Sequence, residues 1–264
     1  MRSPVWPTQL LPGLHLPVEP TRTTFHPAST YNRKASTMTI TRTTTETVAD
    51  LSSGSTRRRR GWALSGLVAG VLGAVQFVVT AGVGVDTAAL ADNRLVAEAL
   101  TDSAPYVWAY QVIAVTTALL VCVFAAGLFR RLSQQGPAES TLPLLAAGGL
   151  FLVAVMQLVG SGICTEMFYG LIQDTGELDP DTLASQLAIF NTMGWVWAGA
   201  GLTAGAVAVA GLRHAAVDRA LALGSAVAAG LIALVNVVPL QYMAMVPGAL
   251  WLIGAGIAFA RGEQ

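Results

Sequence analysis

Six long apolar runs constrain the fold of this chain more than any other feature of its sequence. A helix that crosses about 30 Å of hydrocarbon needs roughly 20 residues at about 1.5 Å each. Runs of this length occupy residues 61–83, 108–129, 141–163, 189–212, 220–238 and 242–260. Hydrophobic residues make up 53% of the chain and charged residues only 11%, which is typical of membrane proteins. The sequence therefore predicts an all-α, polytopic transmembrane bundle of six spans.

The orientation of the spans follows from the distribution of charge, because Lys and Arg near span ends stay on the cytoplasmic side. The arginines that flank the spans fall on one side: Arg57, Arg58, Arg59, Arg60, Arg130, Arg131, Arg213, Arg219 and Arg261. Nine of the fifteen acidic residues fall on the other side: Asp86, Asp92, Glu98, Asp102, Glu166, Asp174, Glu177, Asp179 and Asp181. We therefore expect both termini in the cytoplasm, an acidic outer face, and a location in the cell (inner or plasma) membrane.

The first sixty residues differ in composition from the rest. Six of the twelve prolines lie before residue 28, and residues 36–47 are rich in Thr. Such a segment cannot bury enough apolar surface to form a core. We expect residues 1–60 to be a disordered cytoplasmic tail, with Met38 as the native start, and residues 61–264 to be the six-helix transmembrane domain.

The two outer loops predict short helices. Asp92 can cap a helix in which Leu95, Val96, Ala99 and Leu100 share one face, as in an element on the membrane surface. Asp179-Pro180 places a capping residue before a proline suited to a first helical turn, so the fourth span is expected to begin near residue 180.

Small residues and one proline inside the spans predict how the helices pack. Gly66 and Gly70, and likewise Gly201 and Gly205, have the four-residue spacing that lets helices approach closely, here within one chain. Pro247-Gly248 is expected to kink the sixth span or to loosen its hydrogen bonds.

Carboxamide side chains form the most informative polar pattern. They map to the outer half or outer edge of the membrane, and nearly every span supplies one: Gln76, Gln111, Gln157, Asn191, Asn236 and Gln241. Amides in hydrocarbon are costly unless they are hydrogen-bonded, so they should face inward. Two arrangements remain open. One is an interhelical hydrogen-bond layer that fixes the bundle. The other is an outward-facing polar pocket, roofed by the acidic loops and Glu166, for an uncharged or cationic ligand.

Catalytic and cofactor motifs are missing from the sequence. The three histidines, His15, His26 and His214, lie in the tail and in a cytoplasmic loop, where they cannot pair across helices to hold haem. Cys122 and Cys164 are expected to differ in depth by roughly 20 Å, too far for a disulfide. No zinc spacing, phosphate-binding loop or nucleophile elbow is present, and no carboxylate, Lys, Arg or His lies well inside a span. We expect no catalytic residue, no cofactor and no metal.

Three segments resemble uncharacterised actinobacterial multi-pass membrane proteins. They are Trp195-Val196-Trp197-Ala198-Gly199-Ala200-Gly201-Leu202, Ala210-Gly211-Leu212-Arg213-His214 and Pro239-Leu240-Gln241-Tyr242-Met243. The resemblance covers roughly residues 61–264. It implies a helical bundle in a bacterial inner membrane, and it implies no activity.

Two classes of function are therefore expected, with an enzyme acting on lipid as a remote third. The first is a non-catalytic sensing, accessory or envelope-organising membrane protein. The alternative is a small-solute permease with an outward-facing, amide-lined pocket. The expected partners are membrane lipids, with a small-molecule ligand or a membrane protein as further candidates, and not nucleic acid.

Overall fold

The computed structural model describes residues 45–172 and 179–262, with side chains from residue 61 onward. Its α-helices are α1 Thr45–Thr80, α2 Asn93–Leu100, α3 Ala104–Gln135, α4 Leu142–Ile172, α5 Pro180–Asn191, α6 Ala198–His214, α7 Arg219–Val237 and α8 Met245–Gly262. Short 3₁₀ helices extend or connect them: η1 Ala81–Val83, η2 Ala89–Ala91, η3 Thr101–Ser103, η4 Thr192–Trp197 and η5 Gln241–Ala244. No strand occurs in these two ranges, and the predicted all-α class is confirmed.

The predicted tail and start lie largely beyond what the structure describes. Met38 and the tail as far as residue 44 fall outside the described residues, as do Asp174 and Glu177 of the second outer loop. Residues 45–60, which the sequence assigns to the tail, belong to α1.

Six segments are long and apolar enough to cross a membrane, which confirms the predicted number of spans. They are Gly61–Val83, Asn93–Gln135, Leu142–Ile172, Pro180–His214, Arg219–Val237 and Gln241–Gly262. Each overlaps one predicted apolar run, and the second, third and fourth continue well beyond it. The chain is therefore an integral, multi-pass membrane protein.

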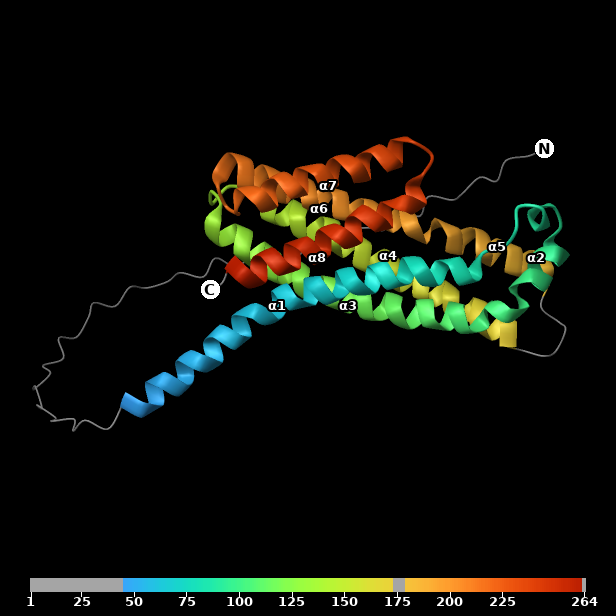
Figure 1. Ribbon diagram of the computed structural model, residues 1–264, viewed down its shortest axis with the longest axis horizontal. Helices are drawn as coiled ribbons and strands as arrows, with labels where there is room; N and C mark the ends of the chain where they lie inside the picture. The colour runs from blue at the N-terminus through green and yellow to red at the C-terminus, as the bar shows by residue number, and fades with distance from the viewer. Residues whose placement is uncertain (1–44, 173–178, 263–264) are drawn as a thin grey trace, which may run out of the picture. The chain divides into compact units, whose positions relative to one another are not determined.

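The bundle contains two antiparallel hairpins, α3 with α4 and α6 with α7. α1 packs against both α3 and α8, while α4 packs against α6 and so joins the hairpins to each other. Figure 1 shows α7 at the edge of the bundle, lying along α6. Only 17% of the residues in the apolar stretch of α7 are buried inside the protein. Most of this helix therefore faces lipid.

Small residues allow the helix backbones to approach closely. A Cβ atom at Gly70 would lie 2.7 Å from the carbonyl oxygen of Ala249, where α1 meets α8. Gly149 and Gly199 face each other in the same way where α4 meets α6. The predicted face at Gly201 contacts Ile232 of α7, so packing within the chain accounts for it.

Two separate groups of buried apolar residues stabilise the fold. The larger, which we call the bundle core, lies among the spans and includes Phe124, Leu150, Trp197 and Leu252. The smaller, which we call the cap core, joins α2 and α5 to the neighbouring ends of α1, α3 and α4. Its members are Val83, Val96, Leu100, Val107, Tyr110, Ala114, Cys164, Met167, Leu183, Leu187, Phe190 and Met193.

Both predicted helix starts in the outer loops are confirmed. The Asp92 side chain accepts a hydrogen bond from the backbone N–H of Arg94 at 2.9 Å, which caps α2. Asp179 occupies the N-cap position of α5 without a side-chain cap hydrogen bond, and Pro180 is the first residue of the helix. Of the four residues on the predicted apolar face of α2, Val96 and Leu100 are buried in the cap core, whereas Leu95 and Ala99 are exposed.

Pro247-Gly248, where the sequence predicted a kink or loosened hydrogen bonds, lies close to the start of an α-helix. The span begins as η5 and becomes α-helical at Met245, so Pro247 stands in the first turn of α8. A first-turn N–H has no partner within the helix, and proline is therefore tolerated there without a break.

Candidate functional site

The buried centre of the candidate site is a pair of amides that bond each other. Gln76 of α1 and Gln157 of α4 are 0% and 1% exposed. Nε2 of Gln76 donates to Oε1 of Gln157 at 3.0 Å, and Nε2 of Gln157 donates to Oε1 of Gln76 at 3.0 Å. This head-to-head arrangement uses one donor and the acceptor of each amide, which offsets the cost of placing them in an apolar interior.

Tyr110 of α3 lies beside the amide pair. Its side chain is 1% exposed and interacts with the side chains of both Gln76 and Cys164. The Tyr110 ring also packs against Phe190 of α5, with ring centroids 4.7 Å apart. Tyr110 therefore connects the amide pair to the cap core.

The other predicted site residues do not join this pair. Gln111 and Gln241 are half-buried, and no described side chain hydrogen-bonds to either. Asn236 donates its Nδ2 proton to the carbonyl oxygen of Ile232 at 2.7 Å, within its own helix. Asn191 and Glu166 are exposed. Among the described residues, the predicted amide layer is thus connected by hydrogen bonds only at Gln76 and Gln157.

A pocket of about 290 Å³ opens next to Tyr110. It is formed where α1, α3, the α5–η4 junction and η5 converge, and Asn191 is the predicted site residue in its wall. Its other polar or aromatic lining residues are Phe77, Thr80, Tyr110, Phe190 and Tyr242. Neither Gln76 nor Gln157 lines it, so the buried pair and the pocket are neighbouring but separate features.

Sequence reasoning did not identify Tyr110 and Tyr242 as site residues, although both line this pocket. A signal for Tyr110 was available in the helical spacing of α3. Val107, Tyr110, Ala114 and Val121 recur at intervals of three, four and seven residues, and all are buried. Gln111, one residue later, points about 100° away from that face and is half-buried.

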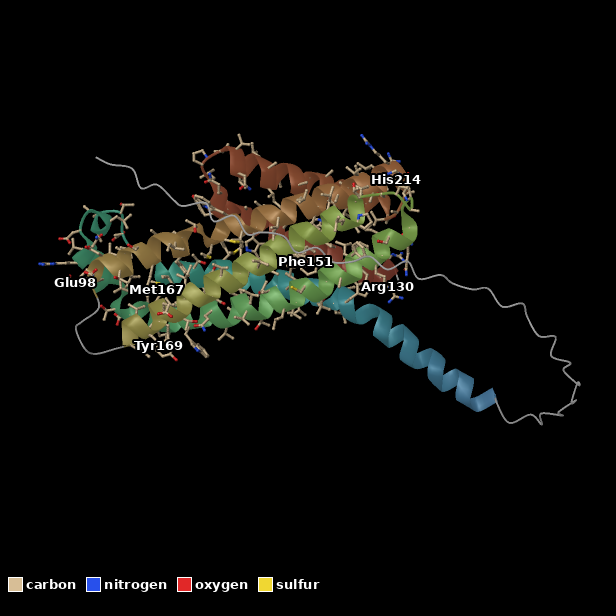
Figure 2. All side chains as sticks on the ribbon, turned by 180° about the vertical axis from the view of Figure 1, so that it is seen from behind. Glu98, Arg130, Phe151, Met167, Tyr169 and His214 are labelled. Atoms are coloured by element: carbon tan, nitrogen blue, oxygen red, sulfur yellow. The ribbon has the colours of Figure 1, made fainter. Side chains whose placement is uncertain are left out.

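Charge is separated between the two ends of the bundle. Figure 2 shows Glu98 and Tyr169 at one end and Arg130 and His214 at the other. Since the helices are antiparallel, Arg131, Arg219 and Arg261 belong to the end of Arg130. The pocket lies toward the opposite, acidic end, where Asp92, Asp102, Glu166, Asp179 and Asp181 are found.

A larger, apolar groove of about 620 Å³ separates α7 from α8. Gly224, Leu231, Pro247 and Leu250 are among its lining residues, and nearby Nε1 of Trp251 donates to Oγ of Ser225 at 2.9 Å. The groove carries no charged lining residue and has the character of a lipid-facing surface.

Metal and disulfide chemistry find no support in the described part of the chain. No cluster of three or more His, Cys, Asp or Glu side chains there could hold a metal ion. Cys122 and Cys164 are both free thiols. Comparison with known protein families, with curated proteins and with solved structures found no match for this chain.

Proposed function

We propose that this chain is a non-catalytic membrane protein with a closed bundle, acting as a sensing, accessory or envelope-organising component. The observation that carries the proposal is the reciprocal bond between Gln76 and Gln157, both almost fully buried. A solute-binding amide has to offer donors or acceptors to its ligand. In this pair the principal hydrogen-bonding groups are already used by the partner side chain.

The interior toward the basic end supports a closed bundle. Trp62, Phe124 and Phe259 pack with ring centroids 5.2 to 6.3 Å apart, and Trp251 adds an edge contact to Phe124. The buried hydroxyls of Ser65 and Thr203 donate to the carbonyl oxygens of Trp62 and Ala146. These polar groups are satisfied within the protein and offer no continuous polar route for a solute.

The small-solute permease remains the second candidate because a pocket does open toward the acidic end and includes Asn191. Passage through the bundle would require the Gln76–Gln157 pair to separate. The two functions therefore differ in whether water reaches that pair.

Cysteine accessibility tests the closed bundle. Gln76→Cys, Gln157→Cys and Asn191→Cys are made singly in a background carrying Cys122→Ala and Cys164→Ala, and each is treated with a membrane-impermeant thiol reagent. We expect labelling at 191, which is exposed, and protection at 76 and 157. Labelling of positions 76 and 157 as fast as position 191, in variants that keep the native thermal stability, would instead support the permease.

We also infer that the end of the bundle bearing Arg130, Arg131, Arg213, Arg219 and Arg261 faces the cytoplasm, with both termini there, in a bacterial inner membrane. The excess of arginine at that end supports this orientation. Cysteines introduced at Gln135→Cys and Asp218→Cys should be protected from impermeant reagent in intact cells, whereas Asp181→Cys should react. The reverse pattern would contradict the orientation.

A further inference from the structure

The pocket beside Tyr110 is unusual in this molecule because its walls are rich in aromatic rings. Phe77, Tyr110, Phe190 and Tyr242 reach it from four different elements, α1, α3, α5 and η5. Phe190 and Tyr110 are fixed by packing against each other, and both are at most 2% exposed. Tyr242 is 52% exposed, so the pocket has a rigid floor and an accessible rim.

Two polar groups at this rim are free to bind a ligand. No described residue hydrogen-bonds to the carboxamide of Asn191 or to the hydroxyl of Tyr242. The hydroxyl of Thr80, in contrast, donates to the carbonyl oxygen of Gln76 at 2.9 Å. The pocket therefore offers an amide and a phenol as hydrogen-bonding groups, together with ring surface.

The charge around the pocket selects among ligands. None of its lining residues is charged, so an anion would find no cationic partner. The surrounding end of the bundle carries Asp92, Glu98, Asp102, Glu166, Asp179 and Asp181 against the single arginine Arg94. Such a field raises the local concentration of cations and lowers that of anions. A volume of about 290 Å³ is near the lower limit for ligand pockets, which favours a small molecule.

We propose that this pocket binds a small organic cation of the alkylammonium class, with choline as the representative probe. Aromatic faces attract quaternary ammonium groups through their negative quadrupoles, and such groups shed water at lower cost than a primary ammonium or a metal ion. The ammonium group lies among the rings of Tyr110, Phe190 and Tyr242, and the choline hydroxyl reaches the carboxamide of Asn191. This site goes beyond the proposed function, since binding requires no passage through the closed bundle.

The test measures choline binding to the purified full chain in nanodiscs by equilibrium dialysis. The comparison ligand is the uncharged isostere of choline, in which carbon replaces the ammonium nitrogen. We expect saturable binding of choline and none of the isostere at the same concentration. Equal binding of the two ligands, or no saturable binding of choline, would overturn the proposal.

Matched variants locate the site. Tyr242→Leu should weaken choline binding by about tenfold, the loss expected when one ring is removed from a cation site. Tyr242→Phe should bind nearly as well as the native chain, because the ring is kept. The control is Tyr169→Leu, since Tyr169 is 54% exposed at the same end of the bundle but lies outside the pocket. Equal weakening by Tyr242→Leu and Tyr169→Leu would place the binding elsewhere.

Two further measurements keep the outcome decisive. If Tyr242→Leu does not fold, choline should still slow thiol labelling of Asn191→Cys in the cysteine-free background, and the isostere should not. Unchanged labelling would overturn the site.

Choline flux into proteoliposomes separates this inference from the proposed function. Binding with flux would support the site and contradict the closed bundle, whereas flux without saturable binding at this pocket would contradict both.

Discussion

The bundle core and the cap core are held together by different kinds of residue. In the bundle core, glycine and alanine let backbones approach closely, as Gly149 and Gly199 do between α4 and α6. In the cap core, the two short helices α2 and α5 contribute large side chains such as Leu100 and Leu187, which are buried in one cluster with Met167 of α4. Lipid offers little hydrophobic drive for helix association, so spans depend on close packing. The short helices α2 and α5 carry large apolar side chains, and their burial stabilises the cap core.

The amide pair lies in the spans and Tyr110 links it to the cap core. Gln76 and Gln157 belong to α1 and α4, which contribute to both cores. Their reciprocal hydrogen bonds join two residues that are 81 positions apart in sequence. We therefore expect the stability of the protein to respond differently to three changes. They are added volume in the bundle core, loss of one amide of the Gln76–Gln157 pair, and loss of the side-chain cap of α2.

The largest effect is expected from added volume in the bundle core. Gly149→Val places a side chain against the carbonyl oxygen of Gly199 and the hydroxyl of Thr203, where a backbone would have to move. We expect the free energy of unfolding in micelles to fall by about 3 kcal/mol, the upper range for overpacking. The matched control is Gly148→Val, because a Cβ atom there would meet no atom within 4 Å beyond its chain neighbours and the nearby backbone of its own helix. Equal loss from both variants would show that close approach is not what stabilises this interface.

An intermediate effect is expected at the amide pair. Gln76→Leu or Gln157→Leu leaves the other amide buried without its partner, and should lower the free energy of unfolding by about 1 to 2 kcal/mol. The double variant should lose less than the sum, because no unpaired amide remains. Gln111→Leu, at a half-buried position without a described partner, should change stability by less than about 0.5 kcal/mol. Additive losses from the two glutamines would contradict a direct interaction.

The spans could be predicted because hydropathy is summed over some twenty residues, so single errors cancel. The helix ends could not be predicted, since helices such as α4 continue past the end of the apolar run at residue 163 to Ile172, through Thr165, Glu166 and Tyr169. These residues are polar or amphipathic. A hydropathy pattern therefore does not show that they continue the helix. The starts of α2 and α5 were predictable because Asp92, which caps α2, and Asp179-Pro180, which precedes and begins α5, specify local backbone geometry.

The sequence could not show in the same way which amide side chains bond to each other at the candidate site. Six amides share one depth range, but which two meet depends on the rotation of each helix and on which helices are neighbours. Spans rich in Ala, Val and Gly have weak periodicity, so they do not define a buried face. Gln157 is buried and Asn236 is bonded within its own helix, although both are single amides in apolar spans. The aromatic pocket likewise depends on four elements that converge only in the folded chain.

The smallest effect is expected at the cap of α2, and it tests whether the cap helices are independent of the bundle core. Asp92→Ala removes the acceptor for the backbone N–H of Arg94, which should destabilise α2 by about 1 kcal/mol. Because Asp92 is exposed, the loss should stay local. Amide hydrogen exchange in residues 93–100 should accelerate about fivefold, the factor that corresponds to about 1 kcal/mol, with no change in α1, α3, α4, α6, α7 and α8. Asp102→Ala is the control, since Asp102 is an exposed carboxylate next to the same helix with no described hydrogen bond. Faster exchange in α4 as well as α2 would mean that the two cores unfold together, and the distinction between them would then concern packing but not stability.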